Sequence, residues 1–250
     1  MVLMDIHSHI LPCVDDGPRD IETSLSILEM MKAQGITDVI ATPHFIATEE
    51  NLEEYMQRVD DSYATLSSIA KDKDLPNIIL GSEVFYFNGI GKSQSIKQLC
   101  INGSEYLLLE LPNYSITSYI LNNIKELKEN LRVTPIIAHI ERYYHERGFR
   151  NLLKLVKDGT VLAQVNATSL LDSPHKKAVL KLIKKGYISF IATDAHSIVN
   201  RPPVLDKALH EVAIHFGSNQ KSLFIKNTEK LYNEITGEYD FAEQKFVYKP

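Results

Sequence analysis

The sequence predicts one α/β domain over residues 1–250, folded as a closed or nearly closed parallel barrel. Two observations predict this fold. Short apolar runs alternate with amphipathic stretches from one end of the chain to the other, without a linker or a short internal repeat. The runs are almost continuously apolar, which is typical of parallel strands that are covered on both faces.

Seven apolar runs predict strands, at Met4–His9, Asp38–Thr42, Ile78–Glu83, Tyr106–Glu110, Thr134–His139, Val161–Asn166 and Ile188–Thr193. Helical periodicity predicts helices at Ile21–Gln34, Leu52–Lys71, Ser118–Asn130, Phe149–Lys157 and His175–Lys185, with further helices from Pro203 onward. Asp20 is a suitable N-cap for the first helix and Gly35 is its C-terminal stop.

Composition excludes several classes of protein. The net charge of −5 argues against a nucleic-acid partner, because such proteins usually carry a basic face. The sequence has neither an apolar run of the ~20 residues that span a bilayer nor the features of a signal peptide. Two cysteines, Cys13 and Cys100, are too few for a disulfide framework. We therefore expect a cytoplasmic protein without a membrane span.

Residues that can bind metal ions stand at the ends of the predicted strands, where a parallel barrel builds its active site. They are His7, His9, His44, Glu83, Glu110, His139, Asp194 and His196. A single strand-end histidine or carboxylate is more often a cap or an ion-pair partner. So many on one rim would be costly to bury unless a cation paired them. Mixed nitrogen and oxygen ligands suit Mn²⁺, Zn²⁺ or Fe, and their number implies two or three ions.

The opening stretch also allows a different interpretation. Cys13 and Arg19 have the spacing of thiol-dependent tyrosine phosphatases. Such a loop needs successive backbone N–H groups around the phosphate, whereas Asp15 and Asp16 would repel it and Pro18 has no N–H. The spacing is therefore interpreted as accidental, and Cys13→Ser is expected to leave turnover intact.

The segments HSHILPCVDDGP, ATPHF, GSEV, LLLELP, AHIERY and ATDAHS…RPP resemble the polymerase and histidinol phosphatase (PHP) family. Within it they are most similar to bacterial tyrosine phosphatases that regulate capsule and exopolysaccharide synthesis. The resemblance covers Met4 to about Pro203. It implies a distorted (β/α)7 barrel with a trinuclear centre, commonly manganese, with iron or zinc as other occupants. The family pattern usually has glycine where this chain has Cys13, which suggests a positive φ angle there.

Carried over by position, the resemblance implies three groups of ligands. They are His7, His9, Glu83 and Asp194 for one ion, Glu83, Glu110 and His139 for a second, and Asp16, His44 and His196 for the third. The choice of Asp16 over Asp15 rests on the family pattern alone.

A water that bridges two such cations ionises near neutral pH, and the resulting hydroxide can attack phosphorus in line. Arg142 and Arg201 follow ligand-bearing strands, and a guanidinium matches the geometry of a phosphoryl group. Tyr86, Tyr143 and Tyr144 are candidates for the walls of a phosphotyrosine slot, with simple packing as the alternative. The lysines near 176–185 are interpreted as a solvated helix face.

These observations predict a metal-dependent phosphotyrosine protein phosphatase. The family resemblance implies a bacterial tyrosine autokinase as its substrate. The alternatives are a small-molecule phosphoesterase such as histidinol phosphatase, and a non-catalytic metal-binding module that docks a partner. The sequence does not indicate an oligomeric state.

Overall fold

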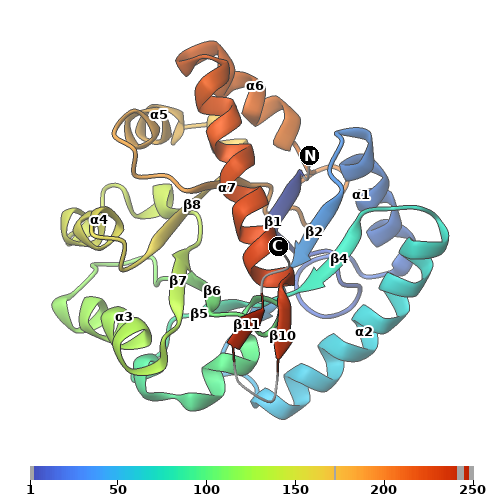
Figure 1. Ribbon diagram of the computed structural model, residues 1–250, viewed down its shortest axis with the longest axis horizontal. Coiled ribbons are helices and arrows are strands. Elements are labelled where there is room, and N and C mark those ends of the chain that lie inside the picture. The colour runs from blue at the N-terminus through green and yellow to red at the C-terminus, as the bar shows by residue number, and fades with distance from the viewer. Residues whose placement is uncertain (1–2, 172, 241–244, 248–250) are drawn as a thin grey trace.

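The computed structural model describes residues 3–171, 173–240 and 245–247, and its parallel strands are surrounded by helices (Figure 1). The strands are β1 (Met4–Ser8), β2 (Asp38–Ala41), β3 (His44–Phe45), β4 (Asn77–Leu80), β5 (Glu83–Phe85), β6 (Tyr106–Glu110), β7 (Thr134–Ile137), β8 (Leu162–Asn166), β9 (Phe190–Ala192), β10 (Glu238–Asp240) and β11 (Lys245–Val247). The α-helices are α1 (Ile21–Ala33), α2 (Leu52–Asp72), α3 (Ser118–Leu131), α4 (Phe149–Lys157), α5 (Lys176–Lys184), α6 (Leu205–Phe216) and α7 (Ser218–Thr236).

The predicted α/β class with parallel strands is confirmed, but the strands lie in two sheets. One sheet has the order β1-β2-β4 and the other β3-β5-β6-β7-β8-β9. The second predicted strand is observed as β2, and an unpredicted short strand, β3, follows Pro43, which cannot donate to a ladder. The third predicted strand is broken into β4 and β5. Between β9 and β1 there is one isolated bridge, from Ser8 to Ala195, with a hydrogen bond from His9 N to Ala195 O (2.8 Å).

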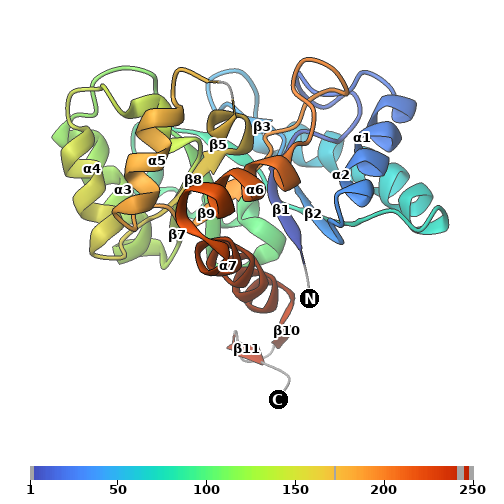
Figure 2. The ribbon, with the colours of Figure 1, turned by 90° about the horizontal axis from the view of Figure 1, so that it is seen from above.

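The helices lie outside the strands, as Figure 2 shows. Asp20 caps α1 as predicted, because its Oδ1 accepts a hydrogen bond from Thr23 N (2.7 Å), and Gly35 follows with a φ of +80°. The predicted bounds of α4 agree with the structure residue for residue. Among the helices that the structure describes, none is both long and apolar enough to cross a bilayer.

The segment between β5 and β6 departs from the regular alternation, since it consists of short 3₁₀ turns at Ile90–Lys92, Gln94–Leu99 and Ile101–Gly103. Gly91 allows the first turn to pack closely on α3. A Cβ atom at this position would lie 2.4 Å from Glu126 Cβ and 2.6 Å from Asn123 O. The absence of a side chain at Gly91 therefore fixes how this irregular segment covers the strands.

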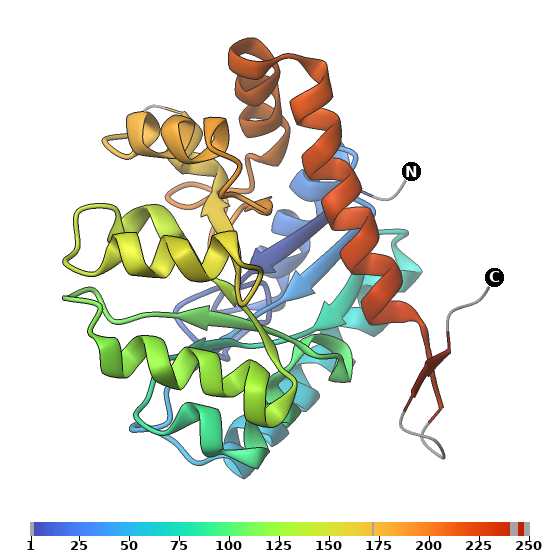
Figure 3. The ribbon, with the colours of Figure 1, turned by 60° about the vertical axis from the view of Figure 1, so that its left-hand side comes forward.

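Two apolar layers hold the fold together. The larger layer lies between the strands and the outer helices, and the smaller one lies inside the ring of strands. The inner layer includes Ile6 of β1, Leu108 of β6 and Phe190 of β9. Leu231 and Ile235 of α7 complete it, so that α7 covers the N-terminal ends of the strands (Figure 3). The helices predicted after Pro203 are confirmed, whereas the antiparallel pair β10–β11 was not predicted.

Candidate metal centre

All nine candidate ligands come together at the C-terminal ends of the strands. The strand register contributes directly, because His44 of β3 is paired with Glu83 of β5. Glu110 ends β6, while His139 and Asp194 each lie two residues beyond the last residue of β7 and β9, respectively. His7 and His9, two residues apart at the end of β1, project to the same face. Asp16 is supplied by the loop that follows β1.

Four side-chain atoms enclose a site of the size of one cation. His7 Nε2 lies 3.2 Å from His9 Nε2, and both nitrogens lie 3.2–3.5 Å from Glu83 Oε2 and Asp194 Oδ1. A regular tetrahedron with metal–ligand bonds of about 2.1 Å has edges of about 3.4 Å. Glu83 Oε2 is buried and accepts no hydrogen bond from the described residues. The spacing and this unsatisfied oxygen both fit a metal ion.

The other groups lie on either side of these four atoms. On one side His139 Nε2 lies 2.9 Å from Glu83 Oε1 and 3.4 Å from Glu110 Oε1. On the other side Asp16 Oδ1 lies 3.0 Å from His196 Nε2 and 3.6 Å from His44 Nε2. These groups could hold two further ions. His9 also lies close enough to share an ion with Asp16, His44 and His196.

His44 contacts more than the one group of ligands to which the family resemblance assigns it. Its Nε2 faces Asp16, but its Nδ1 lies 3.1 Å from Glu83 Oε2, so the ring stands between two of the candidate sites. A second compatible group accordingly contains His44, Glu83 and Glu110.

Three histidines present the same nitrogen to the cluster because their other nitrogen is already engaged. Nδ1 of His7 contacts Gln164 Oε1 (3.3 Å), and Nδ1 of His9 contacts Asp15 Oδ2 (2.6 Å). Nδ1 of His196 contacts the backbone oxygen of Asp194 (3.0 Å). Each oxygen can only accept, so Nδ1 is the donor and Nε2 is left for a cation.

The two adjacent aspartates have different surroundings. Asp15 is largely buried, and its carboxylate accepts hydrogen bonds from His9 Nδ1, from His44 N (3.1 Å) and from Gly17 N (2.9 Å). Asp16 has an exposed fraction of 61% and faces the nitrogens of His44 and His196. The geometry therefore favours Asp16 as a ligand and Asp15 as the residue that orients His9.

The charges in the cluster shift one another's pKa values. Burial alone would lower the pKa of His9, but its contacts with Asp15 and Glu83 raise that pKa to about 10. Burial alone would raise the pKa of Glu83, but His7 and His139 hold it well below its ordinary value. Burial, followed by the charge of Glu83, raises the pKa of Glu110 to about 7. Negative charge is therefore incompletely balanced around Glu110, where an added cation is favourable.

Both candidate phosphate-binding arginines border the cluster. Arg142 NH2 lies 3.2 Å and Arg201 NH2 2.6 Å from Asp194 Oδ2, and each side chain is about two-fifths exposed. A pocket of about 230 Å³ opens beside them, with hydroxyl groups of Thr168 and Ser169 in its lining. This arrangement can bind a phosphoryl group next to the metal ligands.

A sequence model of the capsular polysaccharide synthesis family CpsB/CapC matches residues 3–233. The chain belongs to this family. It is 32% identical to a Staphylococcus aureus protein named CapC, over 98% of each chain. It is 26% identical to the tyrosine-protein phosphatase CpsB of Streptococcus pneumoniae, covering 92% of this chain and 98% of that one. It is 28% identical to the tyrosine-protein phosphatase YwqE of Bacillus subtilis, covering 94% and 93%.

Solved structures agree with this CpsB/CapC membership. A structure described as YwqE from Bacillus subtilis and CpsB from Streptococcus pneumoniae, unique metal-dependent tyrosine phosphatases, aligns with a TM-score of 0.79 at 27% identity. It covers 99% of this chain and 98% of that one. Histidinol phosphate phosphatase from Lactococcus lactis aligns over 87% and 93% with a TM-score of 0.53 at 15% identity, which is a likeness of fold alone.

Two side-chain amides on β8 form hydrogen bonds with candidate ligands of the metal centre. This role was not predicted from the sequence. Gln164 Oε1 accepts a hydrogen bond from His139 N (2.7 Å), and Gln164 Nε2 donates to Asn166 Oδ1 (2.9 Å). Asn166 Nδ2 donates to Asp194 Oδ2 (2.6 Å). The sequence feature that could have indicated this role is the presence of two amide side chains, two residues apart, in an otherwise apolar strand. They fix residues from β7 and β9 relative to each other.

A buried carboxylate at the start of β1 was also missed. Asp5 accepts hydrogen bonds from the backbone N and the hydroxyl of Thr193, which directly precedes Asp194. Burial raises the pKa of Asp5 to about 6, although the hydrogen bonds from Thr193 oppose this. Asp5 thereby ties the ligand-bearing ends of β1 and β9 together.

Backbone strain is concentrated at the site. His139 has a φ of +32° and Asp194 a φ of +54°, a region that non-glycine residues rarely occupy. Such strain persists only where the surroundings over-determine it, and it gathers at functional sites. The hydrogen bond that His139 N donates to Gln164 Oε1 and the one that Asn166 Nδ2 donates to Asp194 Oδ2 supply that restraint here.

None of the three tyrosines proposed as walls of a phosphotyrosine slot lines the pocket at the arginines. Tyr143 is buried, and its hydroxyl is bonded to both the N and the O of Leu111, which makes it a packing residue. Tyr86 is buried as well, and its hydroxyl donates to Asn88 Oδ1 (3.4 Å). Tyr144 lines a different hollow from the pocket at the arginines.

Cys13 lies in a loop that closes on itself. Its φ is +60°, which agrees with the positive φ angle expected at this position. Cys13 N donates to Pro18 O (2.8 Å), and the thiol contacts Arg19 O (2.9 Å). The thiol therefore faces a backbone carbonyl, whereas a thiol-dependent phosphatase surrounds it with N–H donors.

Proposed function

We propose that this protein is a metal-dependent phosphotyrosine protein phosphatase that acts in capsule or exopolysaccharide synthesis. The observation that carries the proposal is the close group of His7, His9, Glu83 and Asp194, with Arg142 and Arg201 beside it. Membership in the CpsB/CapC family and the names of its relatives as tyrosine-protein phosphatases support the same activity.

The proposed ligands form three groups. They are His7, His9, Glu83 and Asp194; Glu83, Glu110 and His139; and Asp16, His44 and His196. We propose Mn²⁺ in all three, because mixed imidazole and carboxylate ligands suit it, with iron or zinc as other occupants. Bound there, the ions would supply an acidic water as nucleophile and positive charge opposite the phosphoryl oxygens.

The protein's own residues position the reaction. Asp15, Gln164 and Asn166 hold ligands in orientation through the hydrogen bonds described above. Arg142 and Arg201 are proposed to grip the phosphoryl group, because both are partly exposed and border the pocket. Both now contact Asp194 Oδ2, while Arg142 NH1 also lies 3.4 Å from Glu110 Oε1 and Arg201 NH1 lies 3.8 Å from Asp16 Oδ2. A bound phosphate would compete with these carboxylates for the guanidinium groups.

The proposed substrate is a phosphotyrosine protein, in the family's context a bacterial tyrosine autokinase in the cytoplasm. We propose that residues 1–250 form one phosphatase domain. Two apolar layers that extend over the described strands and helices support a single unit.

The test combines metal analysis with two substrates. Purified protein with added Mn²⁺ is assayed with a phosphotyrosine peptide and with histidinol phosphate, before and after chelation. We expect turnover of the peptide that a chelator abolishes and Mn²⁺ restores. Preferential turnover of histidinol phosphate would point to the small-molecule alternative. No turnover of either would indicate a binding module, and full activity without metal would refute the mechanism.

A further inference from the structure

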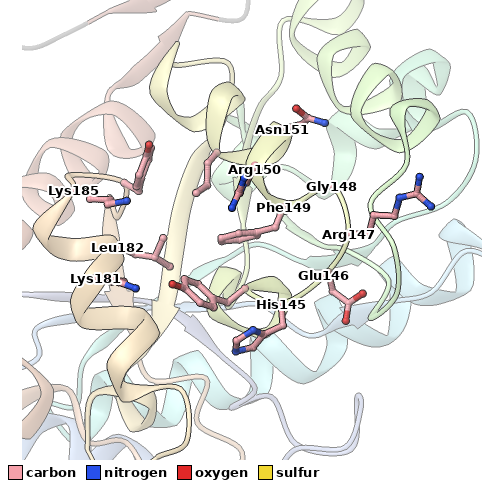
Figure 4. Close-up of a pocket in the computed structure, with 13 residues that line it drawn as sticks. His145, Glu146, Arg147, Gly148, Phe149, Arg150, Asn151, Lys181, Leu182 and Lys185 are labelled. Atoms are coloured by element: carbon pink, nitrogen blue, oxygen red, sulfur yellow. The ribbon is translucent and has the colours of Figure 1, made fainter.

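A second hollow, of about 760 Å³, lies between α4 and α5, outside the metal centre. Arg150 reaches it from α4, and Lys181 and Lys185 reach it from α5 (Figure 4). Arg147 lies at the opposite edge from the two lysines. We call this hollow the basic groove and define it by these four cations.

The cations of the basic groove lack anionic partners among the residues that the structure describes. None of the four takes part in an ion pair there, whereas Lys176 at the start of α5 is paired with Glu211 (2.7 Å). Glu146 is the one carboxylate in the described lining. On a chain whose net charge is −5, such a cluster creates a local positive potential that attracts an anionic ligand.

The basic groove also has apolar walls that suit a peptide chain. Tyr144 packs against Phe149 with ring centroids 5.6 Å apart, and both residues line the groove together with Leu182 and Tyr187. Aromatic and aliphatic walls with a few cations are typical of sites that bind a side chain's apolar body and its charged tip.

The groove and the phosphate pocket are built from the same two segments. Residues 142–151 supply Arg142 to the pocket and Tyr144 to the groove. Residues 173–187 supply His175 to the pocket and Lys181 to the groove. Glu141, which directly precedes the first segment, accepts hydrogen bonds from Ser169 Oγ (2.7 Å) and Asn166 N (3.0 Å), both of which come before the second segment in the chain.

We propose that the basic groove binds acidic residues that flank the phosphotyrosine of the protein substrate. The inference rests on the proposed phosphatase function and adds a substrate class to it. On this proposal, a chain whose phosphotyrosine lies between Arg142 and Arg201 would continue along the two segments that contribute to both hollows. There its carboxylates meet Arg150, Lys181 and Lys185. On this proposal Lys181 and Lys185 would bind substrate, and the other lysines of 176–185 keep the interpretation of a solvated helix face.

The test compares peptides that differ only in flanking charge. One phosphotyrosine peptide carries Asp and Glu on both sides of the tyrosine, and its partner carries Asn and Gln. The proteins are the Mn²⁺-loaded wild type, the triple variant Arg150→Gln/Lys181→Gln/Lys185→Gln and a matched control, Lys157→Gln/Lys177→Gln/Lys184→Gln. The control removes three exposed cations from α4 and α5 that do not line the groove.

We expect the wild type to prefer the acidic peptide about tenfold in kcat/KM, a change that three solvent-exposed charge pairs can support. The preference resides in KM and declines as salt is raised. In the triple variant the ratio falls toward one, and the control retains it. p-Nitrophenyl phosphate is too small to reach along the groove, and its turnover reports whether the metal centre is intact.

A wild type that does not discriminate between the peptides would overturn the inference, as would an equal loss in both triple variants. Binding of the acidic peptide, made with a non-hydrolysable phosphonate and measured by fluorescence anisotropy, separates the two proposals. If no substrate is turned over, the proposed function fails. Weaker binding to the groove variant than to the control would still support the groove, and equal binding would refute it.

Discussion

The two ends of the ring of strands are built on opposite principles. At the N-terminal end Ile6, Leu108 and Phe190 pack on Leu231 and Ile235 of α7, and all five are at least 96% buried. At the C-terminal end the same strands carry imidazoles and carboxylates, left-handed backbone and a buried carboxylate oxygen without a hydrogen bond. The difference indicates that one end supplies stability and the other tolerates costly groups that are useful only with a cation.

The largest effect is expected from removing a ligand at the C-terminal end. Asp194→Ala and His139→Ala should lose metal and activity together, with kcat/KM lower by on the order of 10³-fold, because ion binding supplies several kcal/mol of transition-state stabilisation. Metal content and kinetics are measured on the same samples. The exposed Asp60→Ala serves as the control. Full metal content with retained turnover in either variant would contradict the ligand assignment.

Substitutions at the N-terminal end of the strands should change the stability of the fold without changing metal affinity. Leu231→Ala leaves a cavity in the inner layer and is expected to lower the free energy of unfolding by about 3 kcal/mol. Leu223→Ala, on the same helix but 47% exposed, should cost less than about 0.5 kcal/mol. Denaturant titration gives both values. A loss of metal affinity in folded Leu231→Ala protein would show that the two ends are not independent.

At the C-terminal end, protons and metal ions should compete for the same side chains, so the affinity for metal should depend on pH. His9, with a pKa raised to about 10, holds a proton through the neutral range, and Glu110, with a pKa raised to about 7, holds one below that pH. A metal ion must displace both protons. The affinity for Mn²⁺ should therefore rise about tenfold per pH unit above pH 7 and more steeply below it.

Competition with a chelator dye at several pH values measures this slope. Glu110→Gln should remove the steeper part below pH 7, because glutamine has no proton to displace. One uniform slope from pH 6 to pH 9 in the wild type would contradict the assignment of the pKa near 7 to metal binding.

The smallest effect concerns the loop between the two histidines and α1. Cys13→Gly relieves a positive φ and should raise stability by no more than about 1 kcal/mol, since glycine also adds freedom to the unfolded chain. Cys13→Ser should keep turnover within about twofold. Loss of turnover in Cys13→Ser with normal metal content would revive a role for the thiol.

Much of this organisation could be predicted from sequence because it follows from local patterns. Apolar runs placed the strands, and Asp20 and Gly35 placed the first helix. The ligands could be placed on one rim because parallel strands bring their C-terminal ends together. The pair at His7 and His9 required only the two-residue period of a strand.

The rest depends on contacts between distant residues. Gln164 and Asn166 look like ordinary polar residues until β8 is placed between β7 and β9. The breaks at Pro43 and after Leu80 reflect a bend that two neighbouring strands make together. The choice between Asp15 and Asp16 needed the turn at Gly17, whose backbone N binds Asp15.

Because the chain is synthesised from its N-terminus, the bridge between Ser8 and Ala195 also affects when the site can form. The first strand has no partner on its β9 side until the ribosome has made residue 195. The inner apolar layer stays uncovered for longer, until Leu231 and Ile235 have emerged. Domains generally fold as units, from the N-terminus first, during synthesis. In this chain the earliest residues of the candidate metal centre must wait for α7, so the candidate ligands are not supported by a covered inner layer until residue 235 has been made.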